Sequence, residues 1–191
     1  GEWVIREACH QVKQWQQEDR MLFPISVNLS IRQFYQTDLI PVVQNIIQEV
    51  GIEPEYLELE ITESMAMDVD TASSVLHELK KIGVKIAIDD FGTGYSSLSY
   101  LKKFPIDHLK IDQSFIQDIS ENSDDKDIAS AIIMLAHNLK MRTIAEGVET
   151  EAHLKFLKKQ QCDALQGYYF SRPLEPQAFE EWLRGYEKHA K

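Results

Sequence analysis

The sequence is poor in cysteine, glycine and proline and has no long apolar run, and each shortage excludes a class of protein. With 8 glycines and 6 prolines in 191 residues, the chain is neither fibrous nor linker-like. Its longest apolar run, at 128–136, is about half of the roughly 18 residues that a membrane span needs, and no secretory signal is visible at its start. Cys9 and Cys162 lie far apart, which favours small buried thiols in a reduced, cytoplasmic protein over a disulfide.

Basic residues are also scarce, because 31 acidic side chains stand against 20 basic ones and the formal net charge is -11. This surplus argues against DNA, RNA or an anionic membrane as a partner. It leaves a small anionic substrate open, since bound metal ions can invert the local charge of a site.

Short apolar runs alternate with helix-period segments along the whole chain. The pattern predicts helices at 3–17, 32–50, 71–82, 97–104, 127–140, 151–160 and 177–186, with a polar loop at 120–127. It predicts strands at 25–29, 56–62, 84–89, 108–111, 142–146 and 163–166. Most strands are separated by a helix, which is typical of βα units and a parallel sheet.

Two architectures fit this alternation. An open doubly wound sheet would bind its ligand through a glycine-rich loop, and no such loop follows any of the expected strands. A (β/α)8 barrel takes about 250 residues, so this chain is short of one by roughly two units. We predict an α/β fold of the TIM-like (β/α)8 type, a single domain over residues 1–191 with about six βα units and an incomplete amino-terminal part.

Polar side chains recur at the ends of the expected strands. Successive side chains on a strand point to opposite faces, so that Leu59 and Ile61 share one face of their strand and Glu60 lies on the other. Active sites of such barrels lie at the carboxyl ends of the strands. The side chains expected to converge there are Asn28, Glu60, Asp89, Asp90, Lys110, Glu146 and Gln166.

Four carboxylates at one barrel mouth would repel one another and raise one another's pKa. Mg²⁺ or Mn²⁺ would relieve this repulsion, because both prefer oxygen ligands. The adjacent Asp89 and Asp90 could bridge or divide a pair of such metals about 4 Å apart, whereas cysteine and histidine do not occur at zinc-binding spacing. Taken singly, each residue fits a solvated loop or an ion pair; their recurrence at six strand ends indicates a site.

Six segments carry more specific motifs, which lie in order along nearly the whole chain: VNLS at 27–30, LEITES at 59–64, DDFGTGYSSL at 89–98, LKID at 109–112, AEGVET at 145–150 and QGYYFSRPL at 166–174. Together they resemble the EAL family of bacterial phosphodiesterases, which linearise cyclic di-GMP to pGpG on a (β/α)8-type barrel.

This resemblance implies roles for the strand-end residues. Asn28, Glu60 and Asp89 would hold a first metal, Mg²⁺ or Mn²⁺, and Asp89 would bridge to a second metal bound by Asp90. Lys110 would position the attacking water, and Glu146 would be the general base or a water-mediated metal ligand.

The resemblance also implies roles for residues around this centre. Gln166 would complete the pocket near the scissile phosphate, and Arg172 would either contact substrate or form a structural salt bridge. Glu63 would anchor the loop at 91–98, which links metal binding to dimer formation. The loop residues concerned are Phe91, Gly92, Thr93 and Gly94, whose two glycines give backbone freedom.

The sequence departs from the family in one respect, since no Glu-Ala-Leu occurs in it. In the family that glutamate binds metal and a following arginine contacts the substrate phosphate. The chain is therefore expected to be the C-terminal part of the domain and inactive or impaired alone. Its parent protein is expected to be a cytoplasmic homodimer with sensory or diguanylate-cyclase-like domains, any membrane anchor lying outside this chain.

Two alternative functions are open at this point. A non-catalytic cyclic di-GMP receptor or regulatory scaffold would share the fold, but such relatives usually lose the metal ligands that survive here. A Schiff-base enzyme would use Lys110 as its nucleophile, which the four neighbouring carboxylates disfavour by keeping the amine protonated.

Overall fold

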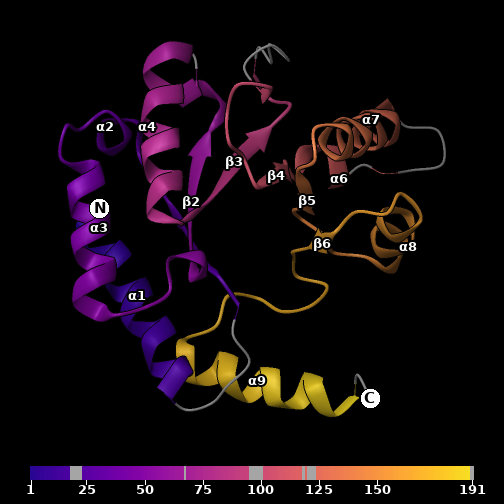
Figure 1. Cartoon of the computed structure of the whole chain (residues 1–191). Helices are drawn as coiled ribbons and strands as arrows, with labels where there is room; N and C mark the ends of the chain where they lie inside the picture. The colour runs from indigo at the N-terminus through magenta and orange to yellow at the C-terminus, as the bar shows by residue number, and fades with distance from the viewer. Residues whose placement is uncertain (18–22, 67, 95–100, 118, 120–123, 190–191) are drawn as a thin grey trace.

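A computed structural model describes residues 1–17, 23–66, 68–94, 101–117, 119 and 124–189. In this part of the chain one sheet of parallel strands forms a half-barrel (Figure 1). The strands are β1 (Ile25–Asn28), β2 (Leu57–Thr62), β3 (Lys85–Phe91), β4 (His108–Ile111), β5 (Arg142–Ala145) and β6 (Ala164–Leu165). They pair in sequence order, as in a TIM-like barrel, whereas a doubly wound sheet reverses its order part-way. The predicted fold class is confirmed.

Helices cover one face of the sheet and leave the other, the inner face, for the site. Longer helices α1 (Glu2–Gln17), α3 (Leu39–Val50) and α4 (Val69–Ile82) lie on the side of β1 to β3. Helix α7 (Asp124–Asn138) packs on β4 and β5, and α8 (Glu151–Lys159) precedes β6. The short helical turns are α2 (Ile31–Phe34), η1 (Pro54–Tyr56), η2 (Glu63–Ala66) and α6 (Ser114–Gln117).

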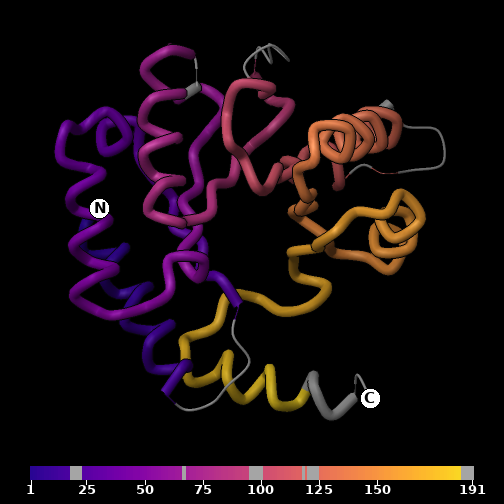
Figure 2. Tube along the Cα trace, viewed as in Figure 1, coloured from indigo at the N-terminus to yellow at the C-terminus, as the bar shows by residue number. Residues whose placement is uncertain are grey.

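The last helix, α9 (Pro176–His189), returns to the first one. Figure 2 shows the yellow helix α9 beside the carboxyl end of the indigo helix α1. The Phe179 ring lies 5.8 Å from that of Trp15 and 5.5 Å from that of Phe23, centroid to centroid. The Trp15 indole also donates a 2.9 Å hydrogen bond to Glu180. These contacts join the carboxyl end of α1 to α9.

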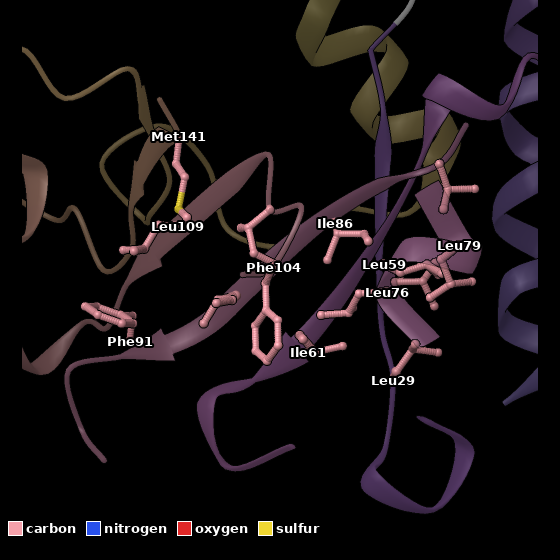
Figure 3. Close-up of a cluster of buried hydrophobic side chains, with 14 of the residues drawn as sticks. Leu29, Leu59, Ile61, Leu76, Leu79, Ile86, Phe91, Phe104, Leu109 and Met141 are labelled. Carbon is pink, nitrogen blue, oxygen red and sulfur yellow. The ribbon is translucent and has the colours of Figure 1, made fainter. Parts of the chain in front are cut away.

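The apolar core lies between the strands and their helices. Leu59 and Ile61 of β2 and Ile86 of β3 are fully buried and lie near Leu76 and Leu79 of α4 in Figure 3. This is the alternation expected from the sequence, in which the apolar face of each strand meets the helices and the polar face points away from them. The site residues therefore project from strands whose opposite face is packed against helices.

Several predicted boundaries are wrong. The helix expected at 32–50 is two helices, α2 and α3. Pro41, in the first turn of α3, has no N–H to donate to the carbonyl four residues before it, and its ring clashes with that carbonyl, so the helix cannot extend backwards through it. Helix α7 begins at Asp124, inside the expected loop at 120–127, and α6 was not predicted. Residues 97–100 of the helix expected at 97–104 lie outside the described residues.

Cys9 is buried in α1 and Cys162 is partly buried, and both are free thiols, as the sequence predicted. Burial raises the pKa of Cys9 to about 11, so its thiol is unreactive at neutral pH. In the part of the chain that the structure describes, no helix combines the length and apolarity that crossing a membrane requires.

Candidate functional site

Parallel register brings the predicted strand-end residues to one edge of the inner face. Asn28 lies beside Glu60, and Thr62 lies beside Asp89. Glu146 follows β5, and its backbone N–H donates to the carbonyl of Ile111 at the end of β4. The backbone N–H of Gln166 donates to the carbonyl of Ala145 at 2.8 Å, which places Gln166 one strand further along.

Lys110 is the centre of this group. Its ammonium nitrogen lies 2.9 Å from Glu60 Oε2, 2.9 Å from Asp89 Oδ1 and 2.8 Å from Glu146 Oε1. Only 4% of Lys110 is exposed. An ammonium has three N–H donors, so these carboxylates satisfy all of them. Side chains from four different strand ends are thus tied to one atom.

Asp90 joins the group through an irregularity of β3. In a regular strand Asp90 would point away from Asp89, but its φ is 53°, in the left-handed region that Asp tolerates better than most residues. The register between β3 and β4 also shifts between Ile88 and Phe91. As a result, Asp89, Asp90 and Glu146 each offer a ligand oxygen, and these atoms lie within 4.8 Å of one another.

These three carboxylates could hold a metal ion, and their oxygen-only donor set suits Mg²⁺ or Mn²⁺. Together with Glu60 and Lys110 they form what we call the carboxylate cluster. Asp112, which follows β4, lies close enough to Asp90 to raise the pKa of that side chain. Asp112 belongs to the LKID motif, but sequence reasoning gave it no role.

Negative charge is in surplus throughout the carboxylate cluster. Burial raises the pKa of Glu60, and repulsion from Asp89 and Glu146 adds to this effect, so that the attraction of Lys110 is outweighed. Burial and then repulsion from Asp89 raise the pKa of Asp90. Burial alone would lower the pKa of Lys110, but its three carboxylate partners raise it instead. A protonated Lys110 does not suit Schiff-base chemistry, which needs a neutral amine.

A family model for the EAL domain matches residues 1–173 of the chain. The chain belongs to the EAL domain family. It is 46% identical over 184 residues to the signaling protein YkoW of Bacillus subtilis (strain 168), a match that covers 96% of this chain and 23% of YkoW. It is 47% identical over 175 residues to the bifunctional diguanylate cyclase/cyclic di-GMP phosphodiesterase MucR of Pseudomonas aeruginosa, covering 91% of this chain and 26% of MucR.

Solved structures agree with this membership. The structure of the PaMucR phosphodiesterase in complex with c-di-GMP has a TM-score of 0.91 at 46% identity, and the match covers 94% of this chain and 73% of that one. The EAL chain thus spans about a quarter of the length of its first curated relatives and about three quarters of that solved chain. It has a partial EAL fold.

Gln166 and Arg172 lie further out in this EAL chain, and both are exposed. A Cβ on Gly167 would lie 2.2 Å from the carbonyl oxygen of Val148, so glycine allows the segment after β6 to lie directly against the segment after β5. The Arg172 guanidinium lies over the ring of Tyr168, 4.6 Å from its centroid. Among the residues that the structure describes, no carboxylate forms an ion pair with Arg172.

Glu63 lies beside the start of the EAL loop at 91–98. Its carboxylate accepts a 3.4 Å hydrogen bond from the N–H of Gly92, and a Cβ on Gly94 would lie 3.1 to 3.2 Å from the same carboxylate. Phe91 is buried in the core, and the Thr93 hydroxyl donates to the carbonyl of Asp90 at 2.9 Å. Residues 95–98 of the loop lie outside the described part of the chain.

A second polar group lies on the same face, nearer the amino ends of the strands. Glu58 of β2 accepts a 2.7 Å hydrogen bond from the Ser26 hydroxyl through Oε1 and contacts His108 Nδ1 of β4 through Oε2. We call Ser26, Glu58 and His108 the lower cluster. Strand alternation puts these residues on the polar face, but no role was predicted for them from the sequence. Their position two residues before Asn28, Glu60 and Lys110 is the signal that could have found them.

Proposed function

We propose that the carboxylate cluster is the metal-dependent catalytic centre of a cyclic di-GMP phosphodiesterase, which converts cyclic di-GMP to pGpG. The observation that carries this proposal is the group of Asp89, Asp90 and Glu146, whose ligand oxygens lie within 4.8 Å of one another beside the buried Lys110. An EAL chain with this donor set fits two-metal hydrolysis of a phosphodiester. MucR, whose name includes this activity, is 47% identical.

Each residue of the carboxylate cluster has a proposed role in this reaction. Asn28, Glu60, Asp89 and Asp90 would hold two divalent cations, Mg²⁺ or Mn²⁺. When bound, such cations lower the pKa of a water ligand and offset the charge of the phosphate. Glu146 would accept the proton of the attacking water at a carboxylate oxygen, and Lys110 would hold that water in line through an N–H donor.

Gln166 and Arg172 would bind the rest of the substrate. Both are exposed, and the Arg172 guanidinium offers donors that match phosphate oxygens. In an acidic chain, the cations together with Lys110 and Arg172 would supply the positive charge that a dianionic substrate needs.

The 191-residue chain by itself is proposed to be inactive or impaired, because it lacks a Glu-Ala-Leu segment. The activity is proposed for the whole protein, which would be cytoplasmic and homodimeric and would carry further sensory or diguanylate-cyclase-like domains. The chain spans only 23% of YkoW and 26% of MucR, which supports the presence of further domains. The contact of Glu63 with Gly92 supports a loop that relays metal binding to a dimer partner.

The test is to incubate the 191-residue chain and the full-length gene product with cyclic di-GMP and Mg²⁺ or Mn²⁺ and to measure pGpG by chromatography. We expect turnover by the full-length protein, loss of that turnover in Asp89→Asn, and little or no turnover by the chain. The absence of pGpG from the full-length protein with either metal would contradict the proposal. Binding of cyclic di-GMP that is unaffected by metal would instead support a non-catalytic receptor.

A further inference from the structure

We propose that the Lys110 ammonium competes with a divalent cation for the same carboxylates, so that Lys110 limits how tightly the site binds metal. This inference rests on the proposed function, because it assumes that the carboxylate cluster takes a divalent cation. It goes beyond that function by giving Lys110 a second task, which is measured by metal binding and not by turnover.

The first step is the overlap of the two donor sets. Two of the three oxygens that accept from Lys110 belong to Asp89 and Glu146, at 2.9 and 2.8 Å. The same two residues, with Asp90, form the group that could hold a metal ion. An oxygen lone pair that accepts an N–H bond is not free for a cation, so each Lys110 contact removes a ligand atom or weakens it.

The second step is electrostatic. A cation held by Asp89 and Glu146 would lie close to the Lys110 nitrogen, because both carboxylates contact that nitrogen. Lys110 is almost fully buried, so water screens the repulsion between the two positive charges poorly. The ammonium therefore lowers the affinity of the site for a divalent cation in addition to occupying its ligands.

The third step explains how Lys110 reaches so many carboxylates. Glu60 is on β2 and Lys110 is on β4, and β3 lies between these strands. The β3 residue that pairs with Glu60 is Ala87, which is fully buried and has only a methyl side chain. A larger residue there would fill the space above β3 through which Lys110 and Glu60 meet.

Competition of this kind links metal loading to the availability of Lys110. A cation that takes an oxygen of Asp89 or Glu146 leaves Lys110 with an N–H donor that no longer has its protein partner. A buried donor without a partner is costly, so this N–H gains by binding a water or a phosphate oxygen. Lys110 would then be available to bind the water or a phosphate oxygen only after a cation has bound at the site.

The test is calorimetric titration of the 191-residue chain with Mn²⁺ at constant ionic strength, comparing wild type, Lys110→Met and Lys155→Met. Lys155 is an exposed lysine with one carboxylate partner, Glu151, at 2.8 Å, so its variant loses the same charge away from the site. We expect Lys110→Met to bind Mn²⁺ about tenfold more tightly or better and Lys155→Met to match wild type. Equal or weaker binding by a folded Lys110→Met variant would overturn the inference.

A second measurement does not depend on the folding of that variant. In ¹⁵N-labelled wild type, the side-chain ammonium signal of Lys110, assigned by its loss in Lys110→Arg, is followed while Mg²⁺ is added. We expect this signal to shift or broaden in step with the amide signal of Asp90, whereas the Lys155 signal stays unchanged. If the Asp90 amide reports binding but the Lys110 signal is constant, competition is wrong. If wild type binds neither Mn²⁺ nor Mg²⁺, the proposed metal site itself fails.

Discussion

Glu58 and Glu60 are two residues apart on β2, face the same way and are both buried, at 2% and 5% exposure, yet their pKa values move in opposite directions. Burial raises the pKa of both. In Glu58 the hydrogen bonds from His108 and Ser26 outweigh burial, and the pKa is lowered. In Glu60 the repulsion from Asp89 and Glu146 adds to burial, and the pKa is raised despite Lys110.

The difference separates a structural carboxylate from a functional one. The lower cluster holds one carboxylate between two donors, and its charge is satisfied within the chain. The carboxylate cluster shares one ammonium among several carboxylates, and its remaining negative charge calls for a cation. A surplus of like charge that the fold retains at a stability cost is typical of a binding site. The following predictions test whether the two clusters differ in this way.

The largest effect is expected for Asp89→Asn. This variant keeps the size of the side chain but removes the charge of a residue that contacts Lys110 and belongs to the candidate metal group. We expect the affinity for Mn²⁺ to fall about 100-fold or more, as measured by calorimetry. Asp38→Asn serves as the control, because Asp38 is exposed and makes no capping hydrogen bond. An Asp89→Asn variant that binds like the control would place the metal elsewhere.

Next in size is the loss of stability in Glu58→Gln. The amide cannot replace both acceptor oxygens, so the donor of either His108 or Ser26 loses its carboxylate partner. We expect the free energy of unfolding in urea to fall by about 1–3 kcal/mol, while the affinity for Mn²⁺ stays at the wild-type value. The exposed Glu55→Gln should change neither quantity. A large loss of metal affinity in Glu58→Gln would show that Glu58 also contributes to metal binding, so that the two clusters would not be functionally separate.

Opposite slopes of stability against pH are expected from the two glutamates. The pKa of Glu58 is lowered from 4.5 in the folded state, so its contribution is present above pH 4.5 and is lost as the pH falls through the folded value. The pKa of Glu60 is raised from 4.5, so the folded state binds the extra proton and stability declines as the pH rises above 4.5.

Urea unfolding between about pH 3.5 and pH 7 tests these slopes. Glu58→Gln should remove part of the loss of stability that wild type shows as the pH falls below 4.5. Glu60→Gln should remove part of the decline in stability that wild type shows as the pH rises above 4.5. At pH 7, Glu60→Gln should therefore be more stable than wild type, by about 1 kcal/mol. Stability lost at pH 7 in both variants would show that Glu60, like Glu58, is satisfied by its partners.

The smallest effect is expected for Ser26→Ala. The Ser26 hydroxyl donates to Glu58, but Ser26 is exposed on the edge strand β1, so water can take its place. We expect a stability loss of about 0.5–1 kcal/mol in urea unfolding. His108→Ala, which removes the other donor, should cost more. The reverse order would mean that β1, not β4, fixes the position of Glu58.

Much of the fold could be predicted from the sequence, because the signals are local. The pattern of apolar runs located all six strands, and the alternation of apolar and polar residues gave, for the first four, the side that packs on helices. It also placed Glu60 and Lys110 at the inner face. The break between α2 and α3 was missed although Pro41 marks it, since the apolar period runs through that proline.

What could not be predicted depends on irregular backbone and on contacts across strands. Asp90 was expected at the site, but the reason it reaches the site was not: strict alternation would send it to the other face, and its left-handed φ and the register shift in β3 bring it to Asp89. The pairing of Glu58 with His108 spans 50 residues, and no local pattern specifies it. The roles of Asn28, Gln166 and Arg172 came from the family resemblance. The positions of Asn28 and Gln166 at strand ends support the first two roles, and Arg172, beyond the end of β6, stays a prediction.

The aromatic contact between α1 and α9 also gives the chain a built-in optical reporter. Of its 3 tryptophans, Trp15 and Trp182 both lie against Phe179, whereas Trp3 is largely exposed. Intrinsic fluorescence should therefore follow the separation of α1 from α9 rather than events at the carboxylate cluster. Whether these two helices separate before the half-barrel unfolds can be read from the emission spectrum, without a label and without a substrate.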